Sequence, residues 1–361
     1  MQQDGLKAAF PGGIQDIIAP GVHNMMPGVI HAGKPAGSQS HYGDQLLFLL
    51  DHQLANDGRV QGWGDFWLSK VKDLPASFYR DQATKDTIAN YEQGKKEASG
   101  SNDLGGVSRL GALLAMASSA GDLADKCAAQ AAATHGDALV NPTARFFAHL
   151  VWAVSETGKT PAELIPDILA SLPDLPAEFT EKVNHGLAGG LAGKDDLEYL
   201  ISIEPVQMSF GEMKFYKGAT CHIPNSLPLS VFLIVKYGNT DAASCVEKAA
   251  VANAMLGGDN CTRALLVGLV LGARPGAVVP PRWIERVRMM KPADLRFLDA
   301  TNSRRNRRRA LQAALAADSL ALGVHWNYSV SRCFCFLRCW CFFSCASRAR
   351  VCASPLCCCQ Q

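Results

Sequence analysis

The chain reads Gly257-Gly258-Asp259-Asn260-Cys261-Thr262-Arg263-Ala264 between two apolar segments. An Ala-rich helical pattern runs up to Leu256, the two glycines interrupt it, and a second apolar pattern begins at Ala264. The polar cluster therefore lies at the start of a helix, where free backbone N–H groups and the positive end of the helix dipole meet. Asp259 and Thr262 can cap that helix or point into a site. Oxygen ligands packed this closely suit a hard cation such as Mg²⁺.

The same helical periodicity extends over most of the chain. It predicts helices over residues 110–118, 121–134, 142–157, 161–171, 177–187, 242–256 and 264–271. A further helix is expected to begin at Asp44 or Gln45 and to run toward Leu54. Residues 229–236 are apolar and β-branched, so the pattern fits either a strand or a buried helix. Because long alternating strands are absent, we predict an all-α domain.

Composition excludes several classes of protein. The net charge of +2 on 361 residues argues against a general nucleic-acid binder. The amino terminus lacks a basic region followed by an apolar core, so no signal peptide is expected. The apolar run near residues 311–326 contains Asp318 and is shorter than the roughly 20 residues of a membrane span. The cysteines before residue 329 are scattered, which suits a reducing compartment, and we expect a cytoplasmic protein.

Several motifs together resemble one family. Gly-Gly-Asp-x-x-Thr at 257–262, followed by Pro281-Arg282-Trp283-Ile284, resembles the closing motif of the ADP-ribosylglycohydrolases, which reads Gly-Gly-Asp-Thr-Asp-Thr. Cys261 replaces the second Asp, as in the J-crystallin and selenoprotein J branch, which carries cysteine or selenocysteine near this point. Residues 40–45 and 221–228 also resemble that branch. The resemblance covers residues 25–290 and implies an orthogonal all-helical domain.

The resemblance also implies an enzyme that cleaves ADP-ribosyl glycosidic linkages with the help of Mg²⁺. The family's early Thr-Asp-Asp-Thr falls on residues 42–45, of which only Asp44 is a carboxylate, and the late trio falls on Asp259, Cys261 and Thr262. A thiol is a poor ligand for Mg²⁺. We therefore expect Asp44, Asp259 and Thr262 to hold one weakly bound Mg²⁺ ion or none, with Asp44 and Cys261 as catalytic residues. Taken singly, Asp44 and Asp259 also fit ordinary helix N-caps.

A second group of residues is expected to bind the ligand. Gly100 and Ser101, followed by residues 105–109, resemble the family's phosphate-contacting loop, in which backbone N–H groups cradle phosphate oxygens. Asp103 stands where that loop has a glycine, which alters the pocket. His135 matches a residue that lines the family's ligand pocket, although an exposed histidine at a helix end fits the pattern as well. The implied partner is an ADP-ribose-type small molecule or an ADP-ribosylated substrate.

Two other functions remain open from the sequence. The degenerate metal motif also suits a catalytically inactive, crystallin-like structural protein. Cys261 at a helix N-terminus suits a thiol-redox protein, because the helix dipole lowers a thiol pKa there. A buried, inert cysteine is the third interpretation of Cys261. The sequence leaves the oligomeric state undetermined.

The order of the motifs divides the chain into four parts. Residues 1–290 form the helical domain without the family's opening helix, and residues 291–310 form an Arg-rich basic linker. Residues 311–328 resemble the missing opening helix, either as the start of a second copy or through circular permutation, and we expect them to dock on the domain. Residues 329–361 hold nine cysteines. They are expected to form no packed unit and to be read-through of shifted-frame sequence. A metallothionein-like tail is the alternative.

Overall fold

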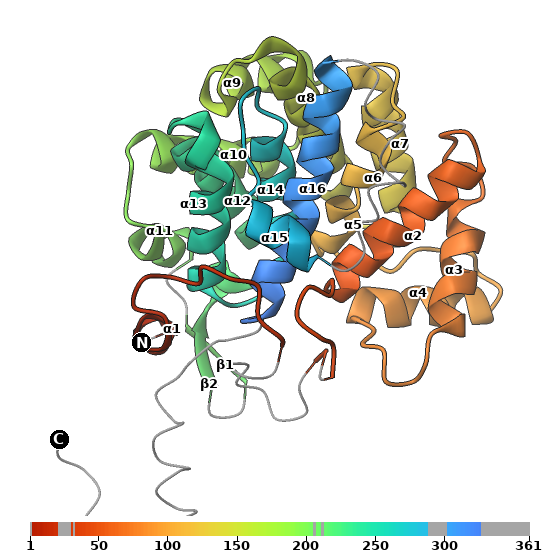
Figure 1. Ribbon diagram of the computed structural model, residues 1–361. Helices are drawn as coiled ribbons and strands as arrows, with labels where there is room; N and C mark the ends of the chain where they lie inside the picture. Colours follow the sequence, from red (N-terminus) through yellow and green to blue (C-terminus); the bar gives the residue numbers. More distant parts are fainter. Residues whose placement is uncertain are drawn as a thin grey trace, which may run out of the picture.

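The computed structural model describes residues 2–20, 30–31, 33–204, 207–210, 213–287 and 302–325. Helices dominate it (Figure 1), which confirms the all-α prediction. The helices are α1 (Gln2–Ala9), α2 (His41–Ala55), α3 (Trp63–Asp73), α4 (Gln82–Glu92), α5 (Gly105–Ser108), α6 (Gly111–Leu114), α7 (Ala120–Ala132), α8 (Val140–Thr157), α9 (Pro161–Ser171), α10 (Ala177–Leu191), α11 (Asp196–Ile203), α12 (Ile223–Gly238), α13 (Ala242–Leu256), α14 (Cys261–Gly272), α15 (Pro281–Arg286) and α16 (Asn302–Leu322).

Two local details differ from the sequence expectation. Helix α2 begins at His41, before the expected start at Asp44 or Gln45, because the Ser40 hydroxyl caps it by accepting a hydrogen bond from the Gly43 N–H at 3.2 Å. A short antiparallel hairpin, β1 (Gln207–Phe210) and β2 (Met213–Tyr216), precedes the 3₁₀ turn η1 (Lys217–Ala219). Residues 229–236 lie in α12, and nearly all of its side chains are buried. A helix buried on every side loses its polar face, so its sequence could not be told from that of a strand.

Helix α14 is the centre of the domain, and all twelve of its residues are buried. It packs against α12, α13 and α16. A Cβ atom on Gly268 would lie 2.6 Å from the Ala313 carbonyl oxygen, and one on Gly272 would lie 2.5 Å from the Ala313 Cβ. The glycines of α14 and the alanines of α16 thus allow the two helices to approach closely. This contact places the first turn of α14 beside the end of α16.

Helix α16 runs through the middle of the molecule (Figure 1) and is part of the same core. Its buried apolar side chains are Ala310, Leu311, Ala313, Ala314, Leu315, Ala316, Ala317, Leu320, Ala321 and Leu322. Because α16 begins at Asn302, the last part of the expected basic linker is helical. Arg307 from that part pairs with Glu156 at 2.9 Å and lies over the Trp152 ring. Residues 326–361, which include the Cys-rich segment, lie outside the described residues.

Buried hydrogen bonds attach α16 to the start of α2. The Asp318 carboxylate accepts hydrogen bonds from the Ser40 backbone N–H at 2.8 Å and from the Ser40 hydroxyl at 2.6 Å. The Ser319 hydroxyl donates to the Ser38 carbonyl at 3.0 Å. Burial raises the pKa of Asp318 to about 6, although the Ser40 bonds act in the opposite direction. Helix α16 is therefore anchored by a carboxyl group that is costly to ionise.

This raised pKa predicts a pH-dependent stability. The Asp318 carboxyl has an ordinary pKa of 3.8 and a folded-state pKa of about 6. Its contribution to stability is therefore fully present below pH 3.8 and is lost as the pH rises through 6. Relative to Asp318→Asn, the wild-type free energy of unfolding should fall by about 2 kcal/mol between pH 4 and pH 7. Denaturant titrations at the two pH values measure this, with the exposed Asp241→Asn as control. Parallel stability curves for wild type and Asp318→Asn would contradict the prediction.

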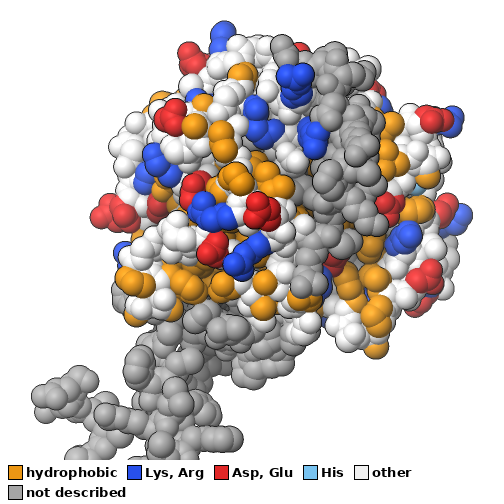
Figure 2. Space-filling model, in the orientation of Figure 1, with side chains coloured by type: hydrophobic (Ala, Val, Ile, Leu, Met, Phe, Trp, Pro, Cys, Tyr) orange, Lys and Arg blue, Asp and Glu red, His pale blue; other side chains and the backbone are white. Residues whose placement is uncertain are grey.

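The surface and the helix lengths bear on possible partners. None of the helices in the described ranges combines the length and the apolarity that a bilayer crossing requires. Lys and Arg side chains are interspersed with Asp and Glu over the described part of the face in Figure 2. Such mixing produces no extended field of one sign on the visible described surface.

Candidate functional site

Three segments that are distant in the sequence meet at one buried site. The Leu104 N–H donates to the Cys221 carbonyl at 3.0 Å, and the Ile223 N–H donates to the Asn102 carbonyl at 2.9 Å. The Asp259 N–H donates to the Ala219 carbonyl at 2.9 Å. The segment after η1 is thus held between the loop that precedes α5 and the turn that precedes α14. One functional side chain from each segment points into the space between them.

The double glycine makes this close approach possible. Gly257 and Gly258 have φ values of +65° and +68°, which side chains rarely adopt, and a Cβ atom on Gly258 would lie 2.5 Å from the Ala219 carbonyl oxygen. Arg263 then fixes the turn from inside the core. Its guanidinium donates to the carbonyl of Asp259 at 2.7 Å and to that of Gly257 at 2.8 Å, and its Nε donates to Asn253 Oδ1 at 3.1 Å. Arg263 is therefore a positioning residue for the Asp259 carboxylate.

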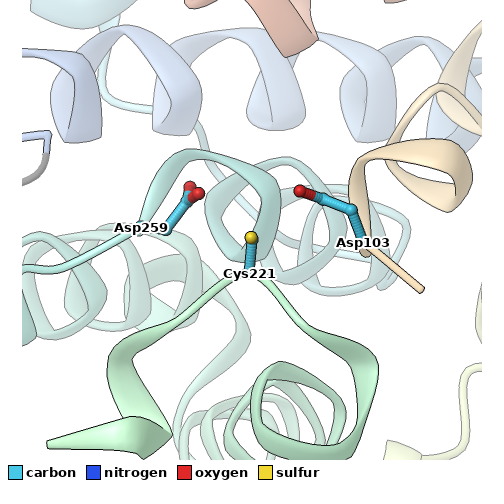
Figure 3. Close-up of side chains that lie close together, drawn as sticks. All are labelled: Asp103, Cys221 and Asp259. Carbon is cyan, nitrogen blue, oxygen red and sulfur yellow. The ribbon is translucent and has the colours of Figure 1, made fainter. Parts of the chain in front are cut away.

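The three converging side chains are Asp103, Cys221 and Asp259 (Figure 3). One carboxylate oxygen of each aspartate and the Cys221 Sγ all lie within 4.8 Å of one another. The Tyr42 hydroxyl lies between the carboxylates, 3.1 Å from Asp259 Oδ2 and 3.3 Å from Asp103 Oδ2. The other Asp103 oxygen accepts a hydrogen bond from the Gly105 N–H at 2.6 Å. Asp259 Oδ1 is buried and accepts no hydrogen bond from any described residue.

Burial and mutual repulsion govern the protonation of this group. Burial raises the pKa of Asp103 to about 7, and the Asp259 carboxylate adds to the rise. Burial also raises the pKa of Asp259, against the opposing effects of His41 and Arg263. The pKa of the Cys221 thiol and that of the Tyr42 phenol are raised well above their ordinary values, by burial first and then by Asp103. The Cys221 thiol and the Tyr42 phenol are therefore neutral near pH 7, and the Asp103 carboxyl is about half protonated there, so the site resists holding several negative charges at once.

Histidine and tyrosine rings line one side of the site. His41 lies against Tyr42, with 3.7 Å between ring centroids, and stacks on His31 at 5.3 Å. His41 Nε2 pairs with the Asp81 carboxylate at 3.2 Å, and this contact helps to lower the pKa of Asp81 against the effect of burial. His325, just beyond α16, lies with its Nε2 3.7 Å from Asp259 Oδ1. Burial and His41 lower the pKa of His325, so its ring is neutral near pH 7.

Asp44 and Asp259, which the sequence analysis combined, have different immediate partners in the structure. Asp44 lies in the first turn of α2, where its carboxylate pairs with Lys34 at 2.5 Å. It does not belong to the group of Asp103, Cys221 and Asp259. Neither Asp44 nor Asp259 is a helix N-cap, since Ser40 and Asn260 hold those positions. The described site therefore uses Asp259 with partners other than Asp44.

Cys261 and Thr262 are fully buried in the first turn of α14. The Cys261 thiol contacts the His325 ring. A position at a helix N-terminus predicts a lowered thiol pKa, but burial, followed by the charges of Asp318 and Asp259, raises the pKa of Cys261 well above its ordinary value. The Thr262 hydroxyl has no hydrogen-bond partner in the part of the chain that the structure describes. The geometry thus favours a neutral thiol at Cys261.

The predicted ligand-binding residues flank the carboxylate pair. The Ser101 hydroxyl accepts a hydrogen bond from the Asp103 N–H at 3.1 Å, and the space beside the Gly100 Cα is open. His135 is buried, not exposed at a helix end, and its Nδ1 lies 2.8 Å from the Thr134 hydroxyl. Burial and the nearby Arg109 lower the pKa of His135 to about 3. His135 is therefore a neutral group under the loop, packed against the position where Gly106 has no side chain.

Sequence reasoning did not assign Tyr42, Asp103 and Cys221 to the site. Each of the three nevertheless lies in a segment that the sequence analysis had singled out. Tyr42 occupies the first position of the early metal quartet, Asp103 stands in place of a loop glycine, and Cys221 opens a segment that resembles the family. What was missing was the information that these three segments meet.

The comparisons with known proteins agree with this fold. A model of the ADP-ribosylglycohydrolase family matches residues 2–328. The chain belongs to the ADP-ribosylglycohydrolase family. A solved structure described as "ADP-ribosylglycohydrolase-related protein complex" is similar over 88% of this chain and 99% of its own, with 18% sequence identity and a TM-score of 0.51. At that identity the likeness supports the fold alone. No curated protein sequence matches the chain.

Divalent metal ions serve many ADP-ribosylglycohydrolases, and the residues here test whether Mg²⁺ fits. Of the expected ligands, Asp44 pairs with Lys34, and Cys261 stands where the family has an oxygen ligand. The donors that do converge are two carboxylates and the Cys221 thiol. Mg²⁺ prefers an octahedral set of oxygen ligands, so this group does not fit the Mg²⁺ site that the resemblance implies.

Proposed function

We propose that this chain binds an ADP-ribosyl group beside Asp103 and Asp259 and hydrolyses the glycosidic bond at its ribose. One observation carries the proposal. Two buried carboxylates share the Tyr42 hydroxyl in a chain of the ADP-ribosylglycohydrolase family. Paired carboxylates are the groups that glycosidic hydrolysis requires.

The two carboxyl groups of the site suit that reaction when they are ionised. When the glycosidic bond breaks, positive charge develops at the anomeric carbon, and fixed negative groups stabilise it. The cations near the site are already engaged. His41 pairs with Asp81, and Arg263 donates to backbone carbonyls. The carboxylates therefore face the substrate position without a side-chain cation between them in the described structure. Asp259 Oδ1, which is buried without a hydrogen-bond donor, is the atom that would accept a proton from the attacking water.

The loop that carries Asp103 is the proposed binding element. Gly100 leaves its backbone open on one side, and Ser101 is partly exposed. Both would contact the ADP-ribose, while His135 supports the loop from below. Assignment to the J-crystallin and selenoprotein J-like branch is part of the proposal and rests on Cys261 and on residues 42–45.

The test is release of ADP-ribose from N-linked and O-linked mono-ADP-ribosylated proteins, with binding of free ADP-ribose measured by calorimetry. We expect both binding and release. Binding without release from either linkage would contradict hydrolysis and favour the inactive, crystallin-like alternative. The thiol-redox alternative receives less support, because the Cys261 thiol is buried and has a raised pKa. Alkylation of Cys261 in the native protein near pH 7 would favour that alternative.

A further inference from the structure

We propose that Asp103, Cys221 and Asp259 together hold one borderline divalent cation of the Zn²⁺ type, in place of the Mg²⁺ that the resemblance implies. This inference concerns the same site as the proposed function and rests on its location. It requires only the three side chains that converge in Figure 3.

The distances suit a single small ion. Donor atoms that bind one tetrahedral zinc lie about 3.4–3.8 Å apart, as bond lengths of about 2.0–2.3 Å dictate. The three candidate donor atoms already lie within 4.8 Å of one another. Small side-chain rotations would therefore complete the site. The backbone hydrogen bonds around Cys221 and Asp259 hold the three segments at this separation.

A buried acceptor without a hydrogen bond gives a second reason for a cation here. Asp259 is 1% exposed, and its Oδ1 accepts no hydrogen bond within the described ranges. A buried carboxylate oxygen without a partner is costly unless a cation or an ordered water contacts it. The His325 Nε2 lies 3.7 Å from this oxygen, but its ring is neutral near pH 7, and Lys34 pairs with Asp44. A bound dication would offset both carboxylates at once.

The ligand types determine which cation is favoured. A cysteine thiolate is a soft ligand that binds Zn²⁺ well and Mg²⁺ poorly, and carboxylates accept either ion. When the ion binds, the Cys221 Sγ–H bond breaks, the thiolate forms a bond to the ion, and the proton leaves to the buffer. Three protein ligands leave a fourth tetrahedral position for a water molecule, as in catalytic zinc sites.

The experiment compares metal binding by the full-length wild-type protein and by Cys221→Ser. After treatment with a chelator, each is titrated with Zn²⁺, with Co²⁺ as a spectroscopic probe, and with Mg²⁺. Because the cysteines of residues 329–361 are present in both proteins, their contribution cancels in the difference. We expect wild type to bind one more equivalent of Zn²⁺, with a thiolate-to-cobalt charge-transfer band that Cys221→Ser lacks. The affinity for that equivalent should fall by at least about 100-fold, the upper end of the loss caused by changing a residue that only supports a metal ligand. Cys127→Ser, which alters a buried cysteine in α7, is the matched control and should behave as wild type.

Asp103→Asn provides a second variant if Cys221→Ser fails to fold, since it removes a ligand charge while keeping the side-chain shape. Equal Zn²⁺ stoichiometry, affinity and cobalt spectra in wild type and in a folded ligand variant would overturn the inference. Tight Mg²⁺ binding that Cys221→Ser does not change would also overturn it. ADP-ribose release is measured separately. A Cys221-dependent Zn²⁺ site without release would support the inference while the proposed function fails, and release without such a site would do the reverse.

Discussion

A chain that ends at Thr301 is expected to lose its cooperative fold. The truncation removes α16, whose apolar side chains fill the core beside α14. Leu311, Leu315, Leu320 and Leu322 alone would each forfeit about 1.5–3 kcal/mol of burial. The sum is on the order of 10 kcal/mol, which is comparable with the whole stability of a typical domain. It would also expose the fully buried helix α14. Circular dichroism during thermal unfolding measures the effect.

A chain that ends at Tyr328 is the matched control. It keeps α16 and removes only the Cys-rich residues 329–361. We expect its melting temperature to equal that of the full-length chain, as the sequence analysis predicts for a segment that forms no packed unit. If the chain ending at Thr301 melts at the same temperature as the one ending at Tyr328, α16 contributes nothing to the core. That result would refute the hypothesis that residues 311–328 replace the family's opening helix in this domain.

Replacing Asp259 with asparagine should reduce ADP-ribose release by about 10²–10⁴-fold, the range for loss of a group that transfers a proton in the transition state. The amide keeps the shape of the side chain but removes the charge that would stabilise the anomeric carbon. The fold should persist, because Arg263 holds the turn through backbone carbonyls, not through the Asp259 carboxylate. Initial rates with a mono-ADP-ribosylated protein measure the loss, and the melting temperature verifies the fold.

Asp44→Asn tests whether the reaction centre lies at Asp103 and Asp259 or at Asp44, which the sequence motif implies. Asp44 pairs with Lys34 and lies outside the converging group, so its replacement should reduce release much less than Asp259→Asn does. The exposed Asp241→Asn serves as a surface control. A larger loss for Asp44→Asn than for Asp259→Asn would place the reaction centre at the start of α2 and refute the assignment made here.

The sequence by itself was sufficient to predict the all-α class, to identify the family motif and to predict that the helix after residue 310, α16, has an apolar face. These features are local. The period of apolar residues, the Gly257-Gly258 break and the Ala-rich pattern after residue 310 are each contained in one short segment, where helix propensity and burial act together. The family model that matches residues 2–328 also relies on such patterns along the chain.

Tertiary structure decided the composition of the site. Asp103, Cys221 and Asp259 come from three separate segments, and they meet because Gly258 lets the Ala219 backbone approach and because Leu104 bonds to the Cys221 carbonyl. No local pattern encodes such contacts. The protonation state of the Cys261 thiol likewise could not be predicted from its position at a helix N-terminus, because it depends on the groups packed around it. A helix N-terminus favours a thiolate, but complete burial near Asp318 and Asp259 opposes it, and the desolvation of a charge outweighs the partial charge of a helix end.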